Sequence, residues 1–484
     1  MVELSDPSLL RQAALINGQW LPPDSNSIEV DNPADGSVVG RVPACGAAET
    51  KAAIDAAKAS WGSWRAMTAN ERCALVERWH ALVLENLDDL ARILTAEQGK
   101  PMAEALGEMR YAASFIKWFA EEGRRVGERN IASPERDRRI IVMVEPVGVS
   151  AAITPWNFPA AMITRKCAPA LAAGCPVVVK PSEMTPFTAL ALGDLALRAG
   201  IPHGVFHIVT GMPQDIGATI TASPDVRKLS FTGSTRVGSL LMRQCADTVK
   251  RLSLELGGNA PLIVFEDADL ELAVKAAMAS KFRNAGQTCV CANRLLVHSA
   301  IHDAFAERLC AEVAKLHVAP GMEEGSTIGP LINDAAVAKV SAHVEDALNR
   351  GGQILGEGGG RNDGRFVRPV VLANANVEMQ LASEETFGPV APLFRFESEA
   401  EAIAMANDTP FGLASYFYTN DVSRAFRVAE QLETGMVALN TGSIAMEMAP
   451  FGGIKQSGIG REGGTHGIEE YLETKAFHVG GLSF

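Results

Sequence analysis

Apolar residues recur at helical spacing through the early part of the chain. Residues 47–121 are predicted to be helical, with Asn70 as the cap of a long amphipathic helix. Its apolar stripe is typical of core packing, so no chemistry is assigned to Leu75, Trp79, Leu82 and Val83. Before the helices, the Asn-Gly pair within residues 16–20 predicts a tight hairpin between two short strands.

From about Arg139 the pattern changes to short β-rich runs that alternate with helices. Strands are predicted at residues 140–144, 149–153, 176–179, 205–209 and 228–231, and helices at 160–173, 185–199 and near 215–222. This alternation is typical of a parallel sheet with crossover helices. A second such stretch starts at residues 261–265 and continues to about residue 440. We therefore expect two α/β lobes, with the active site in the cleft between them.

Composition narrows the class of protein. The 484 residues are 47% hydrophobic and 21% charged, which excludes a mostly disordered chain. The formal net charge of −13 argues against nucleic-acid or anionic-membrane partners. Residues 146–164 are uncharged, but three prolines and Asn157 make a membrane span implausible. No secretory signal is visible, so a cytoplasmic protein is expected.

The eight cysteines do not form a recognisable framework. They are scattered along a long chain, which favours reduced thiols over disulfides. There is no CxxC pair and no HExxH spacing, so no metal site is predicted.

Two residues are candidates for covalent chemistry. Cys289 lies among small and polar residues, where a thiol can be exposed and ionised, although a single cysteine is more often a small buried residue. Glu255 ends a strand-like run, where burial would raise its pKa and suit it to act as a general base. A surface glutamate before a glycine turn is the competing interpretation.

Nucleotide-binding signals are present but weak when taken one at a time. No GxGxxG follows the first strand; glycine-spaced turns occur at residues 211–217 and 231–238, and the second of them opens a helix that can face a phosphate. Lys180 and Glu183 follow a strand, where a carboxylate can bind the adenosine ribose and repel a 2′-phosphate. A simple helix cap explains this segment equally well.

Seven motifs in order along nearly the whole chain resemble the aldehyde dehydrogenase superfamily. They lie at residues 154–159, 180–183, 231–234, 255–258, 286–289, 385–389 and 450–453. The resemblance implies two doubly wound α/β domains with a small β oligomerisation flap. It places an NAD(P)-binding domain at residues 1–125 and 148–256, a catalytic domain at 257–466 and the flap at 126–147 and 467–484.

The resemblance also implies a reaction. Cys289 would attack the aldehyde carbon, and the Asn157 amide with the Cys289 backbone N–H would stabilise the oxyanion. Hydride transfer to the nicotinamide would leave a thioester, for which Glu255 would activate water.

The cofactor assignments also come from the resemblance. Glu385 would hold the nicotinamide ribose with Phe387 near the ring, and Lys180 and Glu183 would hold the adenosine ribose. The remaining expected cofactor-binding residues are Ile153, Thr154, Trp156, Ser182, Gly217, Phe231, Gly233, Ser234, Val237 and Leu256. NAD is the preferred cofactor, with NADP as the alternative, because NADP-preferring bacterial members lack the acidic residue found here.

Within the superfamily, several segments are similar to succinate-semialdehyde dehydrogenases. Arg165 and Arg283 match two arginines that grip the distal carboxylate in that subfamily, although either could be a structural ion-pair residue. The usual substrate-binding serine falls on Ala445, so one hydrogen bond is missing unless Ser443 replaces it. A roomier site would suit glutarate semialdehyde or another ω-oxo acid, and a broad aldehyde dehydrogenase is a further alternative.

Two other properties follow from the resemblance. Cys291 is similar to a cysteine that forms a regulatory disulfide with the nucleophile, although it could simply line the site. The C-terminal segment resembles the strand through which family members associate as homodimers or homotetramers. A thioester hydrolase without hydride transfer and a non-enzymatic protein on this scaffold remain the alternatives from other classes.

Overall fold

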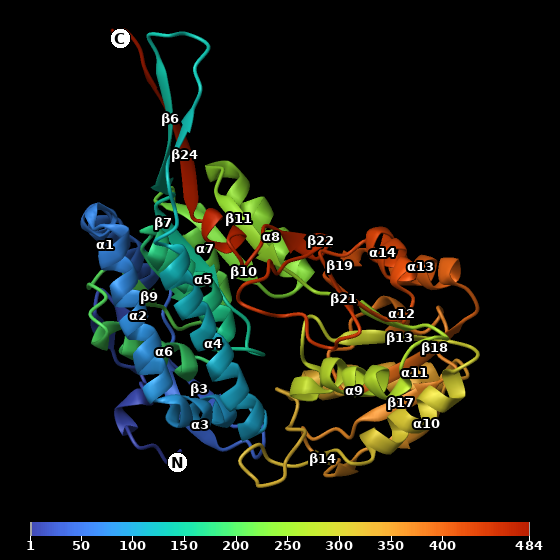
Figure 1. Cartoon of the computed structure of the whole chain (residues 1–484). Helices are drawn as coiled ribbons and strands as arrows, with labels where there is room; N and C mark the ends of the chain where they lie inside the picture. Colours follow the sequence, from blue (N-terminus) through green and yellow to red (C-terminus); the bar gives the residue numbers. More distant parts are fainter. Residues whose placement is uncertain (1, 484) are drawn as a thin grey trace.

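An eight-stranded sheet organises the N-terminal half of the chain; the computed structural model describes residues 2–483 (Figure 1). The strand order is β2-β1-β9-β8-β7-β10-β11-β23, and the five strands from β9 to β11 are parallel. Its strands are β1 (Ala14–Ile16), β2 (Gln19–Leu21), β7 (Val149–Ile153), β8 (Val177–Lys180), β9 (Phe206–Ile208), β10 (Val226–Thr232), β11 (Arg251–Glu255) and β23 (Gly458–Ile459). From β7 the chain adds β8 and β9 on one side and β10 and β11 on the other. The strand order therefore reverses between β7 and β10, where doubly wound sheets bind ligands.

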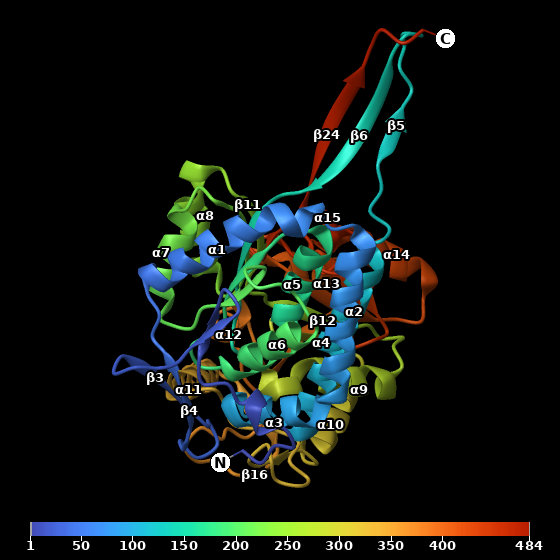
Figure 2. The same cartoon turned by 90° about the vertical axis from the view of Figure 1, so that its left-hand side faces the viewer.

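Helices cover both faces of this sheet. Figure 2 shows α1, α7 and α8 to one side and α2, α4 and α6 to the other. Within β8, Val178 packs with the first group, whereas Val177 and Val179 pack with the second. Burial on both faces explains the continuous apolar run of this strand. The helices are α1 (Ala47–Ala66), α2 (Ala69–Glu85), α3 (Leu87–Gln98), α4 (Met102–Glu122), α5 (Ala161–Ala173), α6 (Phe187–Arg198), α7 (Pro213–Ala222) and α8 (Thr235–Cys245).

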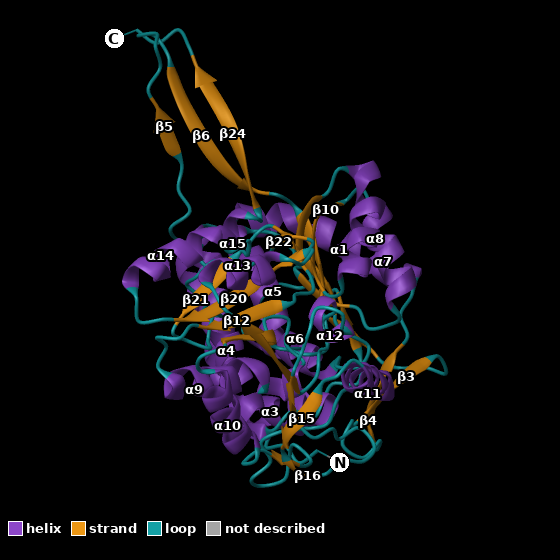
Figure 3. Ribbon diagram, turned by 90° about the vertical axis from the view of Figure 1, so that its right-hand side faces the viewer, coloured by secondary structure: helices purple, strands orange, loops and turns teal. Residues whose placement is uncertain are grey.

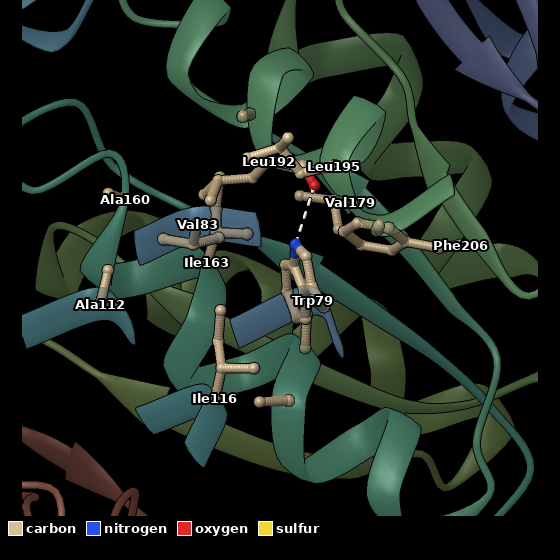
Figure 4. Packing of buried hydrophobic residues seen from close by; sticks show 14 of the residues in the cluster. Trp79, Val83, Ala112, Ile116, Ala160, Ile163, Val179, Leu192, Leu195 and Phe206 are labelled. Carbon is tan, nitrogen blue, oxygen red and sulfur yellow. Dashed lines mark hydrogen bonds between the residues drawn. The ribbon is translucent and has the colours of Figure 1, made fainter. Parts of the chain in front are cut away.

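The predicted apolar stripe of α2 lies in the core of this body. Trp79 and Val83 are fully buried, and Trp79 Nε1 donates to the carbonyl oxygen of Leu192 at 3.0 Å (Figure 4). The predicted cap Asn70 is wrong. Thr68 caps the helix instead, because its hydroxyl accepts from the Glu71 N–H while the Glu71 carboxylate accepts from the Thr68 N–H.

A seven-stranded sheet forms the core of the second body. Its order is β15-β17-β18-β13-β12-β20-β21, parallel except for the edge pair β15 and β17. The strands are β12 (Ala260–Val264), β13 (Ala292–His298), β15 (Gln353–Glu357), β17 (Val370–Ala373), β18 (Val390–Phe396), β20 (Ala414–Tyr418) and β21 (Met436–Leu439). The helices are α9 (Leu270–Lys281), α10 (His302–Val313), α11 (Asp334–Asn349), α12 (Gln380–Ser383), α13 (Glu399–Asn407) and α14 (Val422–Gln431). The predicted fold class of two α/β lobes is confirmed.

A three-stranded antiparallel sheet extends away from the two bodies (Figures 1 and 3). It contains β5 (Arg129–Ile131), β6 (Arg139–Pro146) and β24 (Leu472–Val479), so it joins two segments distant in sequence. The oligomerising role of these segments stays a prediction, as do the domain boundaries. Two elements do not respect those boundaries: β23, from the range assigned to the catalytic domain, pairs with β11 of the first sheet, and α15 (His466–Glu469) spans the boundary at residue 466.

The remaining elements are short. They are β3 (Ser27–Asp31), β4 (Val38–Pro43), β14 (His317–Val318), β16 (Gly359–Gly360), β19 (Phe411–Gly412), β22 (Ile454–Lys455), α15 (His466–Glu469) and the 3-10 turns η1 (Pro7–Leu9), η2 (Ala246–Thr248) and η3 (Arg283–Gly286). Within residues 2–483, no helix is both long and apolar enough to cross a membrane.

Candidate active site

The carboxyl ends of four parallel strands bring several predicted residues to one edge of the first sheet. Ile153 pairs with Lys180 on one side and with Phe231 on the other. Thr232, the next residue of β10, pairs with Glu255 at the end of β11. This register places residues from separate motifs at the edge where an α/β sheet binds its ligands.

A cavity of about 380 Å³ lies at this edge, between the two bodies. The predicted residues among those that line it are Trp156, Asn157, Gly233, Ser234, Leu256, Cys289, Glu385 and Phe387. The other predicted cofactor residues do not line it: Ile153, Thr154, Lys180, Ser182, Glu183, Gly217, Phe231 and Val237. Lys339 lines the cavity and was not predicted. Its ammonium donates to the Glu385 carbonyl oxygen at 2.5 Å, a contact across 46 residues that no local motif indicates.

Cys289 lies on a loop between α9 and β13 and is partly exposed. The loop turns sharply at Asn284 and Ala285, which have φ values of 52° and 55°. Burial raises the pKa of the Cys289 thiol to about 12, and the positive charges of Arg165 and Arg283 oppose the shift. The partial exposure agrees with the expectation, whereas these surroundings favour the protonated thiol over the thiolate.

The Asn157 side chain is held close to this loop. Its Nδ2 donates to the Gln287 carbonyl oxygen at 3.0 Å, which leaves its second N–H for another acceptor. The Asn157 carbonyl oxygen accepts from Lys100 Nζ at 2.8 Å and from Asn284 Nδ2 at 3.0 Å. Lys100 also pairs with Glu108 at 2.6 Å, and both side chains are buried. No motif indicates this role of Lys100, because Asn157 lies 57 residues further along the chain.

Glu255 is buried at the end of β11. Among the described residues, neither of its carboxylate oxygens has a hydrogen-bond partner. Burial raises its pKa well above the usual value, and the negative charge of Glu462 adds to the shift, while Arg165 and Lys166 oppose it. Such a carboxyl group can accept a proton near neutral pH.

The predicted substrate-binding residues separate into two groups. Arg283, Ser443 and Ala445 line a cavity of about 150 Å³. Arg165 does not line this cavity; it is buried, with Nε 3.0 Å from Glu462 Oε2 and its guanidinium over the Phe451 ring. Its Nη2 has no hydrogen-bond partner among the described residues.

Tyr111 is a further polar group near this region that sequence reasoning missed. Its hydroxyl is buried without a partner among the described residues. Burial raises the pKa of this hydroxyl, and the charges of Arg165 and Arg283 oppose the shift. The tyrosine lies on α4 with no motif around it, so only the tertiary structure indicates its place.

The two candidate ribose-binding carboxylates are in different surroundings. Glu183 is partly exposed and forms an ion pair with Lys180 at 2.6 Å. Glu385 is also partly exposed where it lines the cavity, and desolvation there raises its pKa to about 7. Near Glu385, the rings of Trp156 and Phe387 meet edge to face with centroids 5.6 Å apart. Ser234 caps α8 and accepts from the Val237 N–H.

Cys291 lies behind the loop surface. It is 6% exposed, and its sulfur lies 3.3 Å from Lys281 Nζ. Within the described part of the chain there is no group of three or more side chains able to hold a metal ion.

The sequence profile described as the aldehyde dehydrogenase family matches residues 20–477. Because this match spans most of the chain, the protein belongs to the aldehyde dehydrogenase family. It is therefore an oxidoreductase, and its fold has its counterpart in solved structures of aldehyde dehydrogenases.

Individual relatives are similar over nearly their full lengths. The chain is 57% identical to the NADP(+) succinate-semialdehyde dehydrogenase of Escherichia coli over 99% of this chain and 100% of that protein. It is 59% identical to a glutarate-semialdehyde dehydrogenase of Pseudomonas putida over 98% and 99% of the two chains. The crystal structure of a succinate-semialdehyde dehydrogenase from Burkholderia pseudomallei superposes with a TM-score of 0.97 at 58% identity, covering 99% and 100% of the chains.

Replacing the buried lysine tests the support of Asn157. Lys100→Met leaves the Glu108 carboxylate buried without its partner, so we expect a loss of about 3–5 kcal/mol of stability. Loss of the donor to the Asn157 carbonyl should also lower kcat. Urea unfolding and steady-state kinetics measure the two effects.

Lys117→Met is the matched control, because Lys117 pairs with Glu121 on the exposed face of α4. This variant should change little. Equal urea midpoints for the two variants would contradict the structural role of Lys100.

Proposed function

We propose that the protein oxidises a semialdehyde that bears a carboxylate, with succinate semialdehyde as the leading substrate, to the dicarboxylate. The observation that supports this proposal is the position of the Arg283 guanidinium on the loop that carries Cys289. Arg283 lines the 150 Å³ cavity together with Thr288, the neighbour of Cys289, and has no ion-pair partner among the described residues. A guanidinium free of protein carboxylates is suited to a substrate carboxylate.

The covalent step uses Cys289. Its sulfur, once deprotonated, attacks the aldehyde carbon and forms a thiohemiacetal. The free N–H of Asn157, with the backbone N–H of Cys289, stabilises the oxygen on which charge develops. Lys100 and Asn284 support this function because they fix the Asn157 backbone.

The proposed cofactor fits the residues of the larger cavity. Glu385 supplies a carboxylate for ribose hydroxyls, Trp156 and Phe387 supply aromatic surface, and the N-terminus of α8 at Ser234 is suited to phosphate. A nicotinamide dinucleotide, when bound, accepts the hydride from the substrate. Glu255 then takes a proton from the water that hydrolyses the thioester on Cys289.

The second arginine contributes from inside the protein. Arg165 is paired with Glu462, but its Nη2 is a buried donor that a substrate oxygen can satisfy. At position 445 the smaller cavity has an alanine instead of the usual serine, so a hydroxyl is missing there. The nearby Ser443 provides a hydroxyl in the same cavity. Glutarate semialdehyde and other ω-oxo acids are the second candidates, since relatives named for both semialdehydes match equally closely.

We propose NAD as the preferred cofactor, although one close relative is named for NADP(+). Glu183 provides the support, because its carboxylate would lie near the adenosine ribose and repel a 2′-phosphate. The ion pair with Lys180 keeps this carboxylate at the end of β8. We also propose a homodimer or homotetramer assembled through the sheet β24-β6-β5; the cytoplasmic location stays a prediction.

A substrate panel tests the proposed function. We expect NADH formation with three- to six-carbon semialdehydes to exceed that with acetaldehyde and benzaldehyde. Arg283→Leu should lower kcat/KM for the semialdehydes about 10- to 150-fold, the effect of a lost charged hydrogen bond, and leave the uncharged aldehydes unchanged.

Arg308→Leu, on the exposed side of α10, is the control and should have no selective effect. Equal losses for charged and uncharged aldehydes in Arg283→Leu would rule out carboxylate recognition. Activity that survives Cys289→Ala would rule out the nucleophile.

Cofactor preference depends on one negative charge. Glu183→Ser removes the repulsion toward a 2′-phosphate, so kcat/KM for NADP+ should increase about tenfold or more, equivalent to about 1.4 kcal/mol. Initial rates with both cofactors measure the change. Glu307→Ser on exposed α10 controls for net charge, and an unchanged NADP+ to NAD+ ratio in Glu183→Ser would contradict the assignment.

The pH dependence follows from the buried base. Glu255 acts in its deprotonated form, so kcat should increase with pH through a pKa above the usual glutamate value of about 4.3. Glu255→Gln should remove this increase and accumulate the thioester in a burst of NADH. The increase should persist in Glu307→Gln; its persistence in Glu255→Gln would assign the base elsewhere.

A further inference from the structure

A buried lysine contacts a buried cysteine immediately behind the nucleophile loop. Lys281 is fully buried, and its Nζ donates to Cys291 Sγ at 3.3 Å. The thiol in turn donates to the Lys281 carbonyl oxygen at 3.4 Å. Among the described residues, the Lys281 ammonium has no other hydrogen-bond or ion-pair partner. A buried cation is thus paired with a sulfur rather than with a carboxylate.

The local fold produces this contact. Lys281 is the last residue of α9, and the left-handed residues Asn284 and Ala285 reverse the chain after it. The Cys291 N–H then donates to the Thr288 carbonyl oxygen at 2.9 Å. The nine residues between Lys281 and Cys291, which include Cys289, therefore lie between two reactive side chains in contact.

This pairing separates Cys291 from the other thiols. Within residues 2–483, no other cysteine sulfur accepts a hydrogen bond from an amine. Burial raises the pKa of the Cys291 thiol, and the Lys281 ammonium opposes the shift. A positive charge at this distance favours the thiolate, the form that peroxides oxidise.

The smaller cavity lies close to this pair, although neither side chain lines it. That cavity of about 150 Å³ is lined by Ser280 and Val290, the sequence neighbours of Lys281 and Cys291. Hydrogen peroxide is little larger than water, so a cavity of this size accommodates it.

We propose that Lys281 and Cys291 form a covalent sulfenamide, a Cys–S–NH–Lys bond, when the protein is exposed to hydrogen peroxide. The bond closes the loop that carries Cys289. Lys281 therefore competes with Cys289 for the oxidised Cys291. Formation of the sulfenamide prevents the disulfide that the sequence resemblance implies. This inference does not rest on the proposed substrate or cofactor.

The chemistry balances in two steps. The thiolate sulfur of Cys291 attacks one oxygen of hydrogen peroxide, and the O–O bond breaks. The sulfur is oxidised to a sulfenic acid, and the other oxygen takes up one proton and leaves as water. Lys281 then transfers an ammonium proton to the sulfenic hydroxyl, and its freed electron pair forms the S–N bond as that hydroxyl leaves as water. The second excess proton passes to solvent. Two external thiols reverse the reaction, regenerating the thiol and the amine while forming their own disulfide.

Tryptic digestion distinguishes the two cross-links. Trypsin cleaves after Lys275, Lys281, Arg283 and Arg294, so a Cys289–Cys291 disulfide stays inside the single peptide 284–294. The sulfenamide blocks cleavage at Lys281 and joins peptide 276–283 to peptide 284–294. Full-length protein is treated with peroxide, its free thiols are alkylated under denaturing conditions, and it is digested without reductant and analysed by mass spectrometry.

We expect peptides 276–283 and 284–294 to appear joined, with a mass two hydrogens below the sum of the two peptide masses. The joined species should disappear after treatment with dithiothreitol. Lys281→Arg keeps the charge but removes the nucleophilic amine, so it should lose the cross-link and accumulate the disulfide within 284–294. Lys275→Arg, an exposed site on the same helix, is the matched control and should retain the cross-link at 281.

Three results would overturn the proposal. They are normal cleavage at Lys281 in the oxidised wild-type protein, only the disulfide within 284–294, or the joined peptides persisting in Cys291→Ser. The wild-type digest alone decides the first two, so the test does not depend on the folding of any variant. Because no activity is measured, failure of the proposed function would leave the result unaffected.

Discussion

The backbone carbonyl of Asn157 is the point on which the geometry of the site depends. It accepts hydrogen bonds from Lys100, ahead of α4, and from Asn284, on the loop of the second body that carries Cys289. The two donors come from different bodies, so one oxygen fixes the position of the amide relative to the cysteine. The buried Lys100–Glu108 pair makes this arrangement costly to distort, because separating its charges would leave each unpaired in a low-dielectric interior.

Two cations and two carboxyl groups form a buried cluster in the site. The cations are Arg165 and Lys166, and the carboxyl groups are those of Glu255 and Glu462. The two acids differ in their partners, because Glu462 forms ion pairs with both cations. The Glu255 carboxylate has no hydrogen-bond partner within residues 2–483, and its surroundings favour the protonated form. Two carboxyl groups in one buried cluster thus have opposite tendencies, which is the condition for one of them to exchange protons during a reaction.

Local pattern located the central strands of the first sheet, because buried parallel strands are continuous apolar runs between glycine and proline. The run at residues 140–144, expected in the same alternation, instead belongs to β6 of the antiparallel sheet. The predicted strand at residues 149–153 has the observed bounds of β7. The predicted cap at Asn70 was wrong because the cap is Thr68, two residues earlier, where Thr68 and Glu71 satisfy each other's backbone N–H groups. Cys289, Asn157 and Glu255 were singled out mainly by family resemblance. Lys100, Lys339 and Tyr111 were not predicted because their surroundings come from tertiary contacts that no motif encodes.

The short strand β23 has a mechanical consequence. It belongs to the chain segment that follows the second sheet, yet Gly458 pairs with Glu255 itself. A side chain at Gly458 would place its Cβ 1.8 Å from the Leu254 carbonyl oxygen, so only glycine permits this approach. Any rotation that widened the cleft would pull on the backbone of Glu255 through this pairing. The position of the Glu255 carboxyl group is therefore tied by backbone pairing to the C-terminal segment as well as to the first sheet.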